Sequence, residues 1–345
     1  TKTLTATCHC TSSTLSFAVP TSSFPLVTHF CNCSICRYTH GTLASIHTSI
    51  PDPPTITNPD TFTTYKSSKK VTRWFCKTCG AHLVDCAVSS KGVESWCVAT
   101  SLVGGVEGSR EELWEFKRHI FVGDTEDGGL ANWIFEYDGK KLEKWIGRDA
   151  TVRTEENKHG DWVHHDVGNK EKKEKSNVAE DKLKASCHCG GVEFYISRPG
   201  GDKAFDSLPS SLTPKDRDKW YASNDVCDSC RLVSSSMVVS WVFPDTSHIS
   251  LPDGSPWRFE FGTAKTYKTS EDVTRSFCGT CGALVCYSTA DRPDMIDIGV
   301  GLLRGKSVLC EDWLEWRTNK LSWEEDCKWP GFSESLKKGL KQWGE

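Results

Sequence analysis

The sequence predicts a mainly β protein made of two tandem domains, and two observations carry this prediction. The cysteine motifs of the first half return in the second half. In addition, apolar and polar residues alternate over short runs, a pattern typical of half-buried strands. The repeated motifs are Cys8-His9-Cys10 with Cys187-His188-Cys189, and Phe75–Ala81 with Phe277–Ala283.

The expected elements follow from these runs. Strands are predicted at Ser13–Val19 and Gly191–Ile196, where side chains alternate, and at Met237–Phe243, a β-branched and aromatic run. The one convincing helical pattern spans Ser333–Trp343, where apolar residues share a face.

A charged linker separates the two copies in this interpretation. Its centre, Asn169–Lys175, has no apolar residue and is typical of solvated chain. The sequence therefore divides into a first domain at 1–148, a linker at 149–184 and a second, divergent domain at 185–345.

Composition narrows the class of protein. The 345 residues carry a formal net charge of -4, which gives a nucleic-acid partner no electrostatic support. No apolar run approaches the roughly 20 residues of a membrane span, and the first residues do not resemble a secretory signal. The 18 cysteines fall mostly in CxC and CxxC pairs, which suit metal better than disulfides. We therefore expect a cytoplasmic, zinc-binding protein with a small-molecule substrate.

Eight cysteines have the spacing of closed zinc sites. Residues i and i+2 of a strand point to the same face, so a CxC pair can direct both sulfurs to one ion. A CxxC pair followed by glycine makes a turn that brings two more thiolates together. Four thiolates leave no open position, so these sites are expected to be structural. The predicted sets are Cys8, Cys10, Cys76 and Cys79 in the first domain, and Cys187, Cys189, Cys278 and Cys281 in the second.

Three further ligands remain in each domain. Cys31, Cys33 and Cys36 combine a strand-type CxC with a CxxC turn, and three ligands leave a zinc ion open to water or substrate. The corresponding residues of the second domain are Asp225, Cys227 and Cys230. A carboxylate ligand would make that zinc the stronger Lewis acid, unless the second site has decayed. The expectation is about two zinc ions per domain, with both open sets as catalytic candidates.

The first-domain motifs resemble those of a known family. Cys8-His9-Cys10, Cys31–Arg37 with Gly41, Phe75–Leu83 and His119–Val122 are similar to the motifs of the glutathione-dependent formaldehyde-activating enzymes, a family that includes centromere protein V. The resemblance covers most of residues 4–135 and returns more weakly across 185–317. It implies an Mss4-like, zinc-stapled β fold in each domain.

The resemblance also implies a reaction. Glutathione and formaldehyde would condense to S-hydroxymethylglutathione, a carbon-sulfur lyase reaction run in reverse, at the zinc held by Cys31, Cys33 and Cys36. Because glutathione is anionic, Arg37, Arg73 or Lys77 is expected to receive its carboxylates. The second domain departs from the family pattern at Asp225, at Leu284 in place of His82, and at Trp313–Arg317 in place of His119–Val122.

Two other functions stay open at this level. One is a zinc enzyme without a thiol co-substrate that uses Asp225, Cys227 and Cys230. The other is a non-catalytic, zinc-stabilised binding module. The two copies are expected to pack as a pseudo-dimer within one chain or to assemble further as a homo-oligomer.

Overall fold

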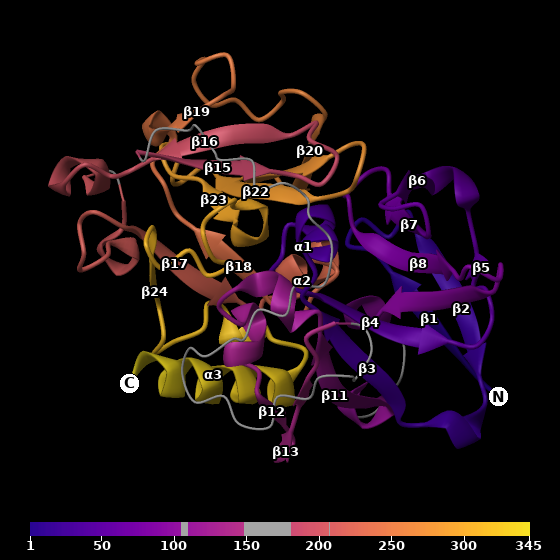
Figure 1. Cartoon of the computed structure of the whole chain (residues 1–345). Helices are drawn as coiled ribbons and strands as arrows, with labels where there is room; N and C mark the ends of the chain where they lie inside the picture. Colours follow the sequence, from indigo (N-terminus) through magenta and orange to yellow (C-terminus); the bar gives the residue numbers. More distant parts are fainter. Residues whose placement is uncertain (105–109, 148–180, 207) are drawn as a thin grey trace.

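The two halves of the chain are each built around β-sheets (Figure 1). The computed structural model describes residues 1–104, 110–147, 181–206 and 208–345, and strands predominate over helices in them. This confirms the prediction of a mainly β, duplicated fold. Residues 149–180 of the predicted linker lie outside the described residues. The strand β15 begins at Lys182, inside the range assigned to the linker, because Leu183 and Ala185 are buried in the second half.

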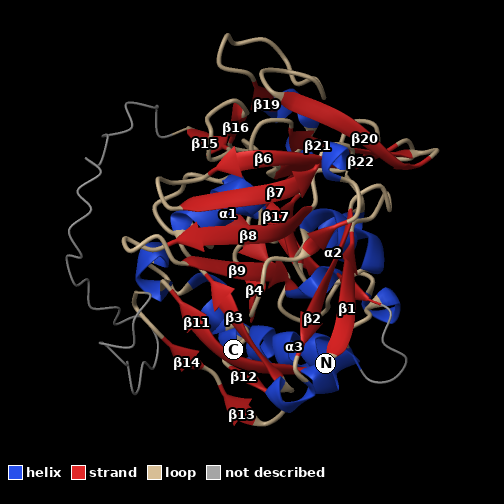
Figure 2. Cartoon of the chain, turned by 90° about the vertical axis from the view of Figure 1, so that its right-hand side faces the viewer, coloured by secondary structure: helices blue, strands red, loops and turns tan. Residues whose placement is uncertain are grey.

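The described part of the first half contains one large sheet and two smaller ones. In the large sheet the order is β14 (Glu143–Lys144), β11 (Trp114–Ile120), β3 (Leu26–Cys31), β4 (Ser45–Ile50), β9 (Glu94–Ala99), β8 (His82–Val88), β7 (Val71–Cys76) and β6 (Phe62–Lys66). The smaller sheets are β10 (Val103–Gly104), β1 (Lys2–Thr7), β2 (Thr14–Val19) and β5 (Thr55–Ile56), and the pair β12 (Glu136–Tyr137) and β13 (Lys140–Lys141). Figure 2 shows β6, β7, β8, β9 and β4 following one another across the large sheet.

The second half repeats this plan in its described residues. The large sheet has the order β20 (Ala264–Ser270), β21 (Val273–Cys278), β22 (Leu284–Thr289), β23 (Asp297–Gly299), β18 (Val239–Val242), β17 (Trp220–Asp225) and β24 (Leu314–Trp316). The small sheet has the order β15 (Lys182–Ser186), β16 (Glu193–Ser197) and β19 (Ile249–Ser250). Both large sheets contain an equivalent parallel pair, β11 beside β3 and β24 beside β17, and in the first half β14 also pairs in parallel with β11.

The predicted elements are present with small changes at their ends. The three predicted strands are β2, β16 and β18, and the predicted helix is α3 (Pro330–Gly344). Two short helices were not predicted, α1 (Ser34–His40) and α2 (Asp228–Ser234). Of the helices in the described residues, none combines the length and the apolar character needed to cross a membrane.

The zinc-knuckle hairpins are near copies of each other. Phe75 pairs with His82 across β7 and β8, and Phe277 pairs with Leu284 across β21 and β22, with the register shifting at this point in both hairpins. Gly80 and Gly282 have φ of 81° and 79°, the left-handed conformation that glycine adopts without strain. The structure therefore confirms that Leu284 occupies the place of His82.

The C-terminal helix α3 packs on the first half, although it belongs to the second half by sequence. Figure 1 shows α3, in yellow, beside β12. Its rings Phe332 and Trp343 contact Phe30 and Trp133, with ring centres 6.3 and 5.7 Å apart. A side chain at Gly339 would collide with the carbonyl oxygen of Trp133, so glycine permits this close approach. The two halves therefore share a core that neither half encloses alone.

Reciprocal contacts join the two halves. His9 Nδ1 lies 2.9 Å from the Tyr267 hydroxyl, and His188 Nδ1 lies 2.6 Å from the Tyr65 hydroxyl. Each CxC histidine thus contacts the strand of the other half that precedes the zinc-knuckle hairpin, β20 for His9 and β6 for His188. In the same reciprocal manner α1 packs against a short 3-10 helix at Val300–Leu302, and α2 against one at Thr100–Leu102.

Candidate metal centres

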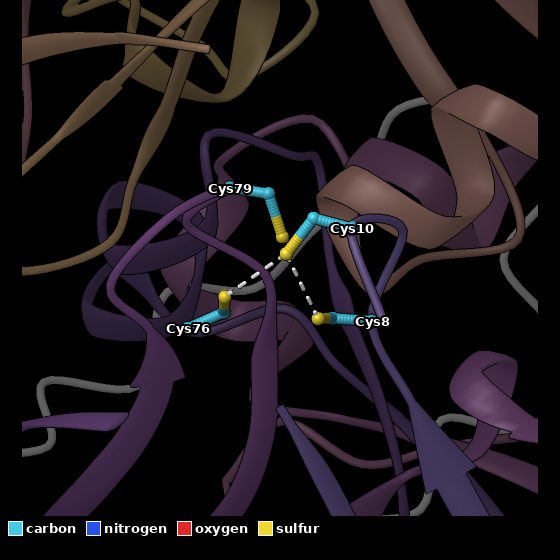
Figure 3. A group of neighbouring side chains, drawn as sticks. All are labelled: Cys8, Cys10, Cys76 and Cys79. Carbon is cyan, nitrogen blue, oxygen red and sulfur yellow. Dashed lines mark hydrogen bonds between the residues drawn. The ribbon is translucent and has the colours of Figure 1, made fainter. Parts of the chain in front are cut away.

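The first closed cluster unites two distant motifs. Cys8 and Cys10 follow β1, Cys76 ends β7, and Cys79 lies in the turn before β8. Figure 3 shows the four sulfurs converging on one point, and their ligand atoms all lie within 4.8 Å of one another. Cys187, Cys189, Cys278 and Cys281 form the same arrangement in the second half.

The sulfur spacing fits tetrahedral zinc. A tetrahedron with Zn–S bonds of about 2.3 Å has edges of about 3.8 Å. Cys10 Sγ lies 3.5 Å from both Cys8 Sγ and Cys76 Sγ, much longer than a disulfide bond of about 2.05 Å. The sulfurs of Cys187 and Cys189 are also 3.5 Å apart. Both four-thiol sets can therefore hold a zinc ion with no open position.

The first open cluster is built by the end of a strand and the start of a helix. Cys31 ends β3, Cys33 is the N-cap of α1, and Cys36 lies in the first turn of that helix. The Cys33 sulfur accepts a hydrogen bond from the Cys36 backbone N–H at 3.3 Å, as N-cap side chains do. The predicted CxxC turn is thus a helix N-terminus. Sequence reasoning missed it because cysteine is an uncommon N-cap residue.

The second open cluster has the same geometry with one changed ligand. Asp225 ends β17, and Cys227 is the N-cap of α2 and accepts from the Cys230 N–H at 3.2 Å. The ligand atoms of Asp225, Cys227 and Cys230 lie within 4.8 Å of one another, as do those of Cys31, Cys33 and Cys36. The structure therefore places all fourteen predicted ligands in the four predicted groups.

A buried arginine lies behind the first open cluster. Arg73 Nη2 donates to Cys36 Sγ at 3.2 Å, Nη1 donates to Asp85 at 2.6 Å, and Nε donates to Ser67 at 3.0 Å. His47 lies 3.5 Å from the same Asp85 oxygen. Arg73 is 3% exposed and fully engaged within the protein, so this geometry favours a structural role for Arg73 over the predicted contact with glutathione.

The corresponding arginine of the second half has different surroundings. Arg275 Nη2 lies 3.5 Å from Cys230 Sγ, which repeats the contact of Arg73 with Cys36. Tyr287 replaces Asp85 opposite this arginine, and the ring lies 4.7 Å from the Arg275 guanidinium carbon. Among the described residues, Arg275 Nε and Nη1 have no hydrogen-bond partner.

Buried histidines surround the first open cluster. His40 stacks on His82 with ring centres 4.3 Å apart, and His47 lies 5.5 Å from His40. Burial lowers the pKa of both His47 and His82 to about 4, so these rings are neutral at pH 7. The second half has Trp241 and Leu284 in place of His47 and His82, so this polar cluster belongs to the first half.

Arg37 is also a structural residue in this geometry. It is 4% exposed, and it donates to the backbone oxygens of Asn32 at 3.1 Å and Asp124 at 3.0 Å. These bonds attach α1 to the loop that follows β11. The predicted contact of Arg37 with glutathione stays a prediction.

The counterpart of His119–Val122 in the second half lies later in the chain than expected. Ile120 pairs with Cys31, and Ser322 pairs with Asp225, so Leu321–Glu324 is the equivalent segment rather than Trp313–Arg317. Both segments lead to a carboxylate at the helix start. Asp124 accepts from the Ser34 N–H at 3.2 Å, and Asp326 accepts from the Asp228 N–H at 2.9 Å. The sequence hid this equivalence because the two segments have no residue in common.

The fold and its clusters define a class of protein: a duplicated β protein in which each half has a four-thiol cluster and a three-ligand cluster that could hold zinc. The chain belongs to the glutathione-dependent formaldehyde-activating enzyme family, whose sequence profile matches residues 3–124 and 213–318. The second match leaves out Cys187 and Cys189, which the structure nevertheless brings to Cys278 and Cys281.

Other comparisons add little. No curated protein sequence matches the chain. A solved structure, described as a crystal structure of a Rhodobacter sphaeroides protein, is 18% identical and covers 39% of this chain and 99% of its own. Its TM-score of 0.26 is too low to support an argument about this protein.

Proposed function

We propose that the first open cluster is the site where glutathione and formaldehyde condense to S-hydroxymethylglutathione. The observation that carries the proposal is the three-thiol group of Cys31, Cys33 and Cys36, which lies within the first segment matched by the family profile. Cys33 is half-buried, so the group lies near the protein surface.

The reaction joins the glutathione sulfur to the formaldehyde carbon. The S–H bond breaks, the C–S bond forms, and the thiol proton ends on the former carbonyl oxygen, so no oxidant or reductant is needed. Zinc held by the three thiolates would supply Lewis acidity and a position for a thiol or a carbonyl oxygen.

Residues of the chain prepare this cluster for the reaction. The Arg73 hydrogen bond to Cys36 draws electron density from that sulfur and makes it a weaker donor to a metal. Asp85 holds Arg73 in position, and the neighbouring neutral histidines add no charge at pH 7. Arg73 is therefore the positively charged group behind the cluster. Its buried ion pair with Asp85 holds the guanidinium in position against Cys36.

The test compares matched N-cap substitutions in the zinc-loaded protein. Cys33→Ser is expected to abolish the acceleration of S-hydroxymethylglutathione formation over the uncatalysed reaction, measured by exchange NMR of labelled formaldehyde with glutathione. Cys227→Ser, the same change at the second open cluster, is expected to retain it. Circular dichroism and zinc content show that each variant is folded. Full activity in folded Cys33→Ser would overturn the assignment, and activity without glutathione would favour an enzyme with no thiol co-substrate.

A further inference from the structure

The second open cluster has a polar neighbour that comes from the other half of the chain. Ser229, in the first turn of α2, lies 3.2 Å from His9 Nε2 and 3.3 Å from Arg275 Nη2. His9 belongs to the first half, where it stands between the zinc-cluster residues Cys8 and Cys10. The surroundings of the second open cluster are therefore completed by both halves.

In one His9 tautomer these contacts leave the Ser229 proton free for a ligand. A guanidinium only donates, so Arg275 takes one lone pair of Ser229 Oγ. The Tyr267 hydroxyl lies 2.9 Å from His9 Nδ1, and when it donates there, Nε2 carries the ring proton and donates to Ser229. Both lone pairs of Ser229 are then occupied. Its own proton is left to donate to a ligand, and Ser229 is half-buried and within reach of one.

Arg275 places a positive charge beside the same cluster, because its Nη2 lies 3.5 Å from Cys230 Sγ. Its side chain is 3% exposed, and Nε and Nη1 have no hydrogen-bond partner among the described residues. In the first half the same two nitrogens of Arg73 are bound to Ser67 and Asp85. A buried charged group that lacks partners is costly, so an anion bound at the cluster would be stabilised by the charge of Arg275.

The charges counted at the second cluster oppose an anionic ligand less than those at the first. A zinc ion bound by Asp225, Cys227 and Cys230 brings two positive charges against three negative ones, and Arg275 restores neutrality. In the first half Asp85 adds a further negative charge behind Arg73. A monoanion therefore meets less repulsion at the second cluster than at the first.

The first half lacks the serine donor. Ile35 has the position of Ser229, between the two cysteines of the CxxC motif, and its side chain cannot form a hydrogen bond. The first half does have the equivalent histidine–tyrosine pair, His188 and Tyr65. However, the first open cluster has Ile35 where the second has Ser229. The two open clusters thus differ in a ligand, in both residues between the cysteines of the CxxC motif, and in the partner of the buried arginine.

We propose that the second open cluster is a binding site for a small carboxylate. One carboxylate oxygen would take the open metal position, and the other would accept a hydrogen bond from Ser229 beside the positive charge of Arg275. His9 is a positioning residue that orients Ser229 from the other half. The proposal does not depend on glutathione chemistry at the first cluster.

The test uses formate as the probe and the full chain loaded with cobalt(II) in place of zinc. Formate bound at an open cobalt site has its proton relaxation strongly enhanced, whereas the closed four-thiol sites offer no position for it. Metal analysis first establishes that all clusters are loaded. No glutathione or formaldehyde is present, so failure of this proposal is distinct from failure of the proposed reaction.

The expected result is saturable relaxation that survives Cys33→Ser and is lost in Cys227→Ser. Ser229→Ala should weaken formate binding about tenfold or more, the effect of losing a hydrogen bond to a charged group. Arg275→Met should weaken it to a similar extent, because it removes the positive charge beside the cluster and the hydrogen bond that positions Ser229. His9→Ala should weaken it as well, and the matched variant His188→Ala should not.

Three outcomes would overturn the proposal. These are no saturable relaxation in the fully loaded protein, loss of relaxation in Cys33→Ser instead of Cys227→Ser, and unchanged affinity in both Ser229→Ala and Arg275→Met. Displacement of formate by inorganic phosphate at lower concentration than by acetate would overturn the assignment of the ligand as a carboxylate.

Discussion

The ion pair of Arg73 and Asp85 can be examined by removing its members separately and together. The side chains are 4% and 12% exposed, and Arg73 Nη1 lies 2.6 Å from Asp85 Oδ2. The substitutions are Arg73→Met, Asp85→Leu and the double variant. Each single change leaves one buried charge without its ion-pair partner, whereas the double change removes both charges.

The magnitudes follow from this burial. Breaking a buried pair from one side costs about 3–5 kcal/mol, while replacing the whole pair with apolar residues is often close to neutral. Among the described residues, Asp85 in Arg73→Met would keep only His47, at 3.5 Å, as an ion-pair partner. We therefore expect each single variant to lose about 3–5 kcal/mol of unfolding free energy, and the double variant to lose less than either.

The assay is urea unfolding followed by tryptophan fluorescence at a fixed free zinc concentration. Zinc content is measured for every variant, because Arg73 also contacts Cys36. Arg275→Met is the matched control, and it should cost less, since Arg275 has no hydrogen-bonded carboxylate among the described residues. Additive losses in the double variant, with zinc content unchanged, would refute the reasoning.

Three further predictions concern pH, helix docking and metal release. His82→Leu, the residue found at Leu284, should remove part of the acid sensitivity. Burial lowers the pKa of His82 from 6.5 to about 4, so the unfolded state binds the extra proton and about 3 kcal/mol is lost as pH falls through this range. Unfolding at pH 7 and pH 4.5 checks this, and an unchanged difference between the two pH values would contradict it. Gly339→Ala should loosen α3 at a cost of about 1–3 kcal/mol, because a Cβ there would collide with the Trp133 carbonyl oxygen. Gly147→Ala, where a Cβ meets nothing within 4 Å, is the control, and equal stability of the two variants would argue against close docking. A chelator should remove zinc in two phases, with the three-ligand clusters emptied before the four-thiol clusters; a single phase in a zinc-release assay would count against that division.

Local sequence was sufficient for much of the metal-site prediction. A CxC pair places two sulfurs on one side of the chain, and a CxxC-Gly turn does the same, whatever the rest of the fold. Because both motifs occur twice, the pairing of Cys8 and Cys10 with Cys76 and Cys79 could be inferred from repetition. The open clusters were assigned from the ligands that remained, and the structure groups them as expected.

The residues that surround the open clusters could not be predicted from local sequence. Arg73 and Arg275 stand in identical Val-Thr-Arg motifs, yet one is held by Asp85 and the other faces Tyr287. That difference depends on which residue of the next strand is opposite, and register is a property of the sheet. The helices α1 and α2 were missed because each is too short for a clear helical period and begins at a cysteine cap.

Residue identity and short-range spacing were enough to predict the grouping of the candidate metal ligands, the duplication and the mainly β class. Only the folded structure shows which residues of one half lie beside the clusters and the core of the other. His9 meets Ser229 across the two halves, and α3 packs beside Trp133. Contacts between residues more than 200 positions apart arise when the sheets and helices of the two halves pack together, and no local sequence pattern encodes them.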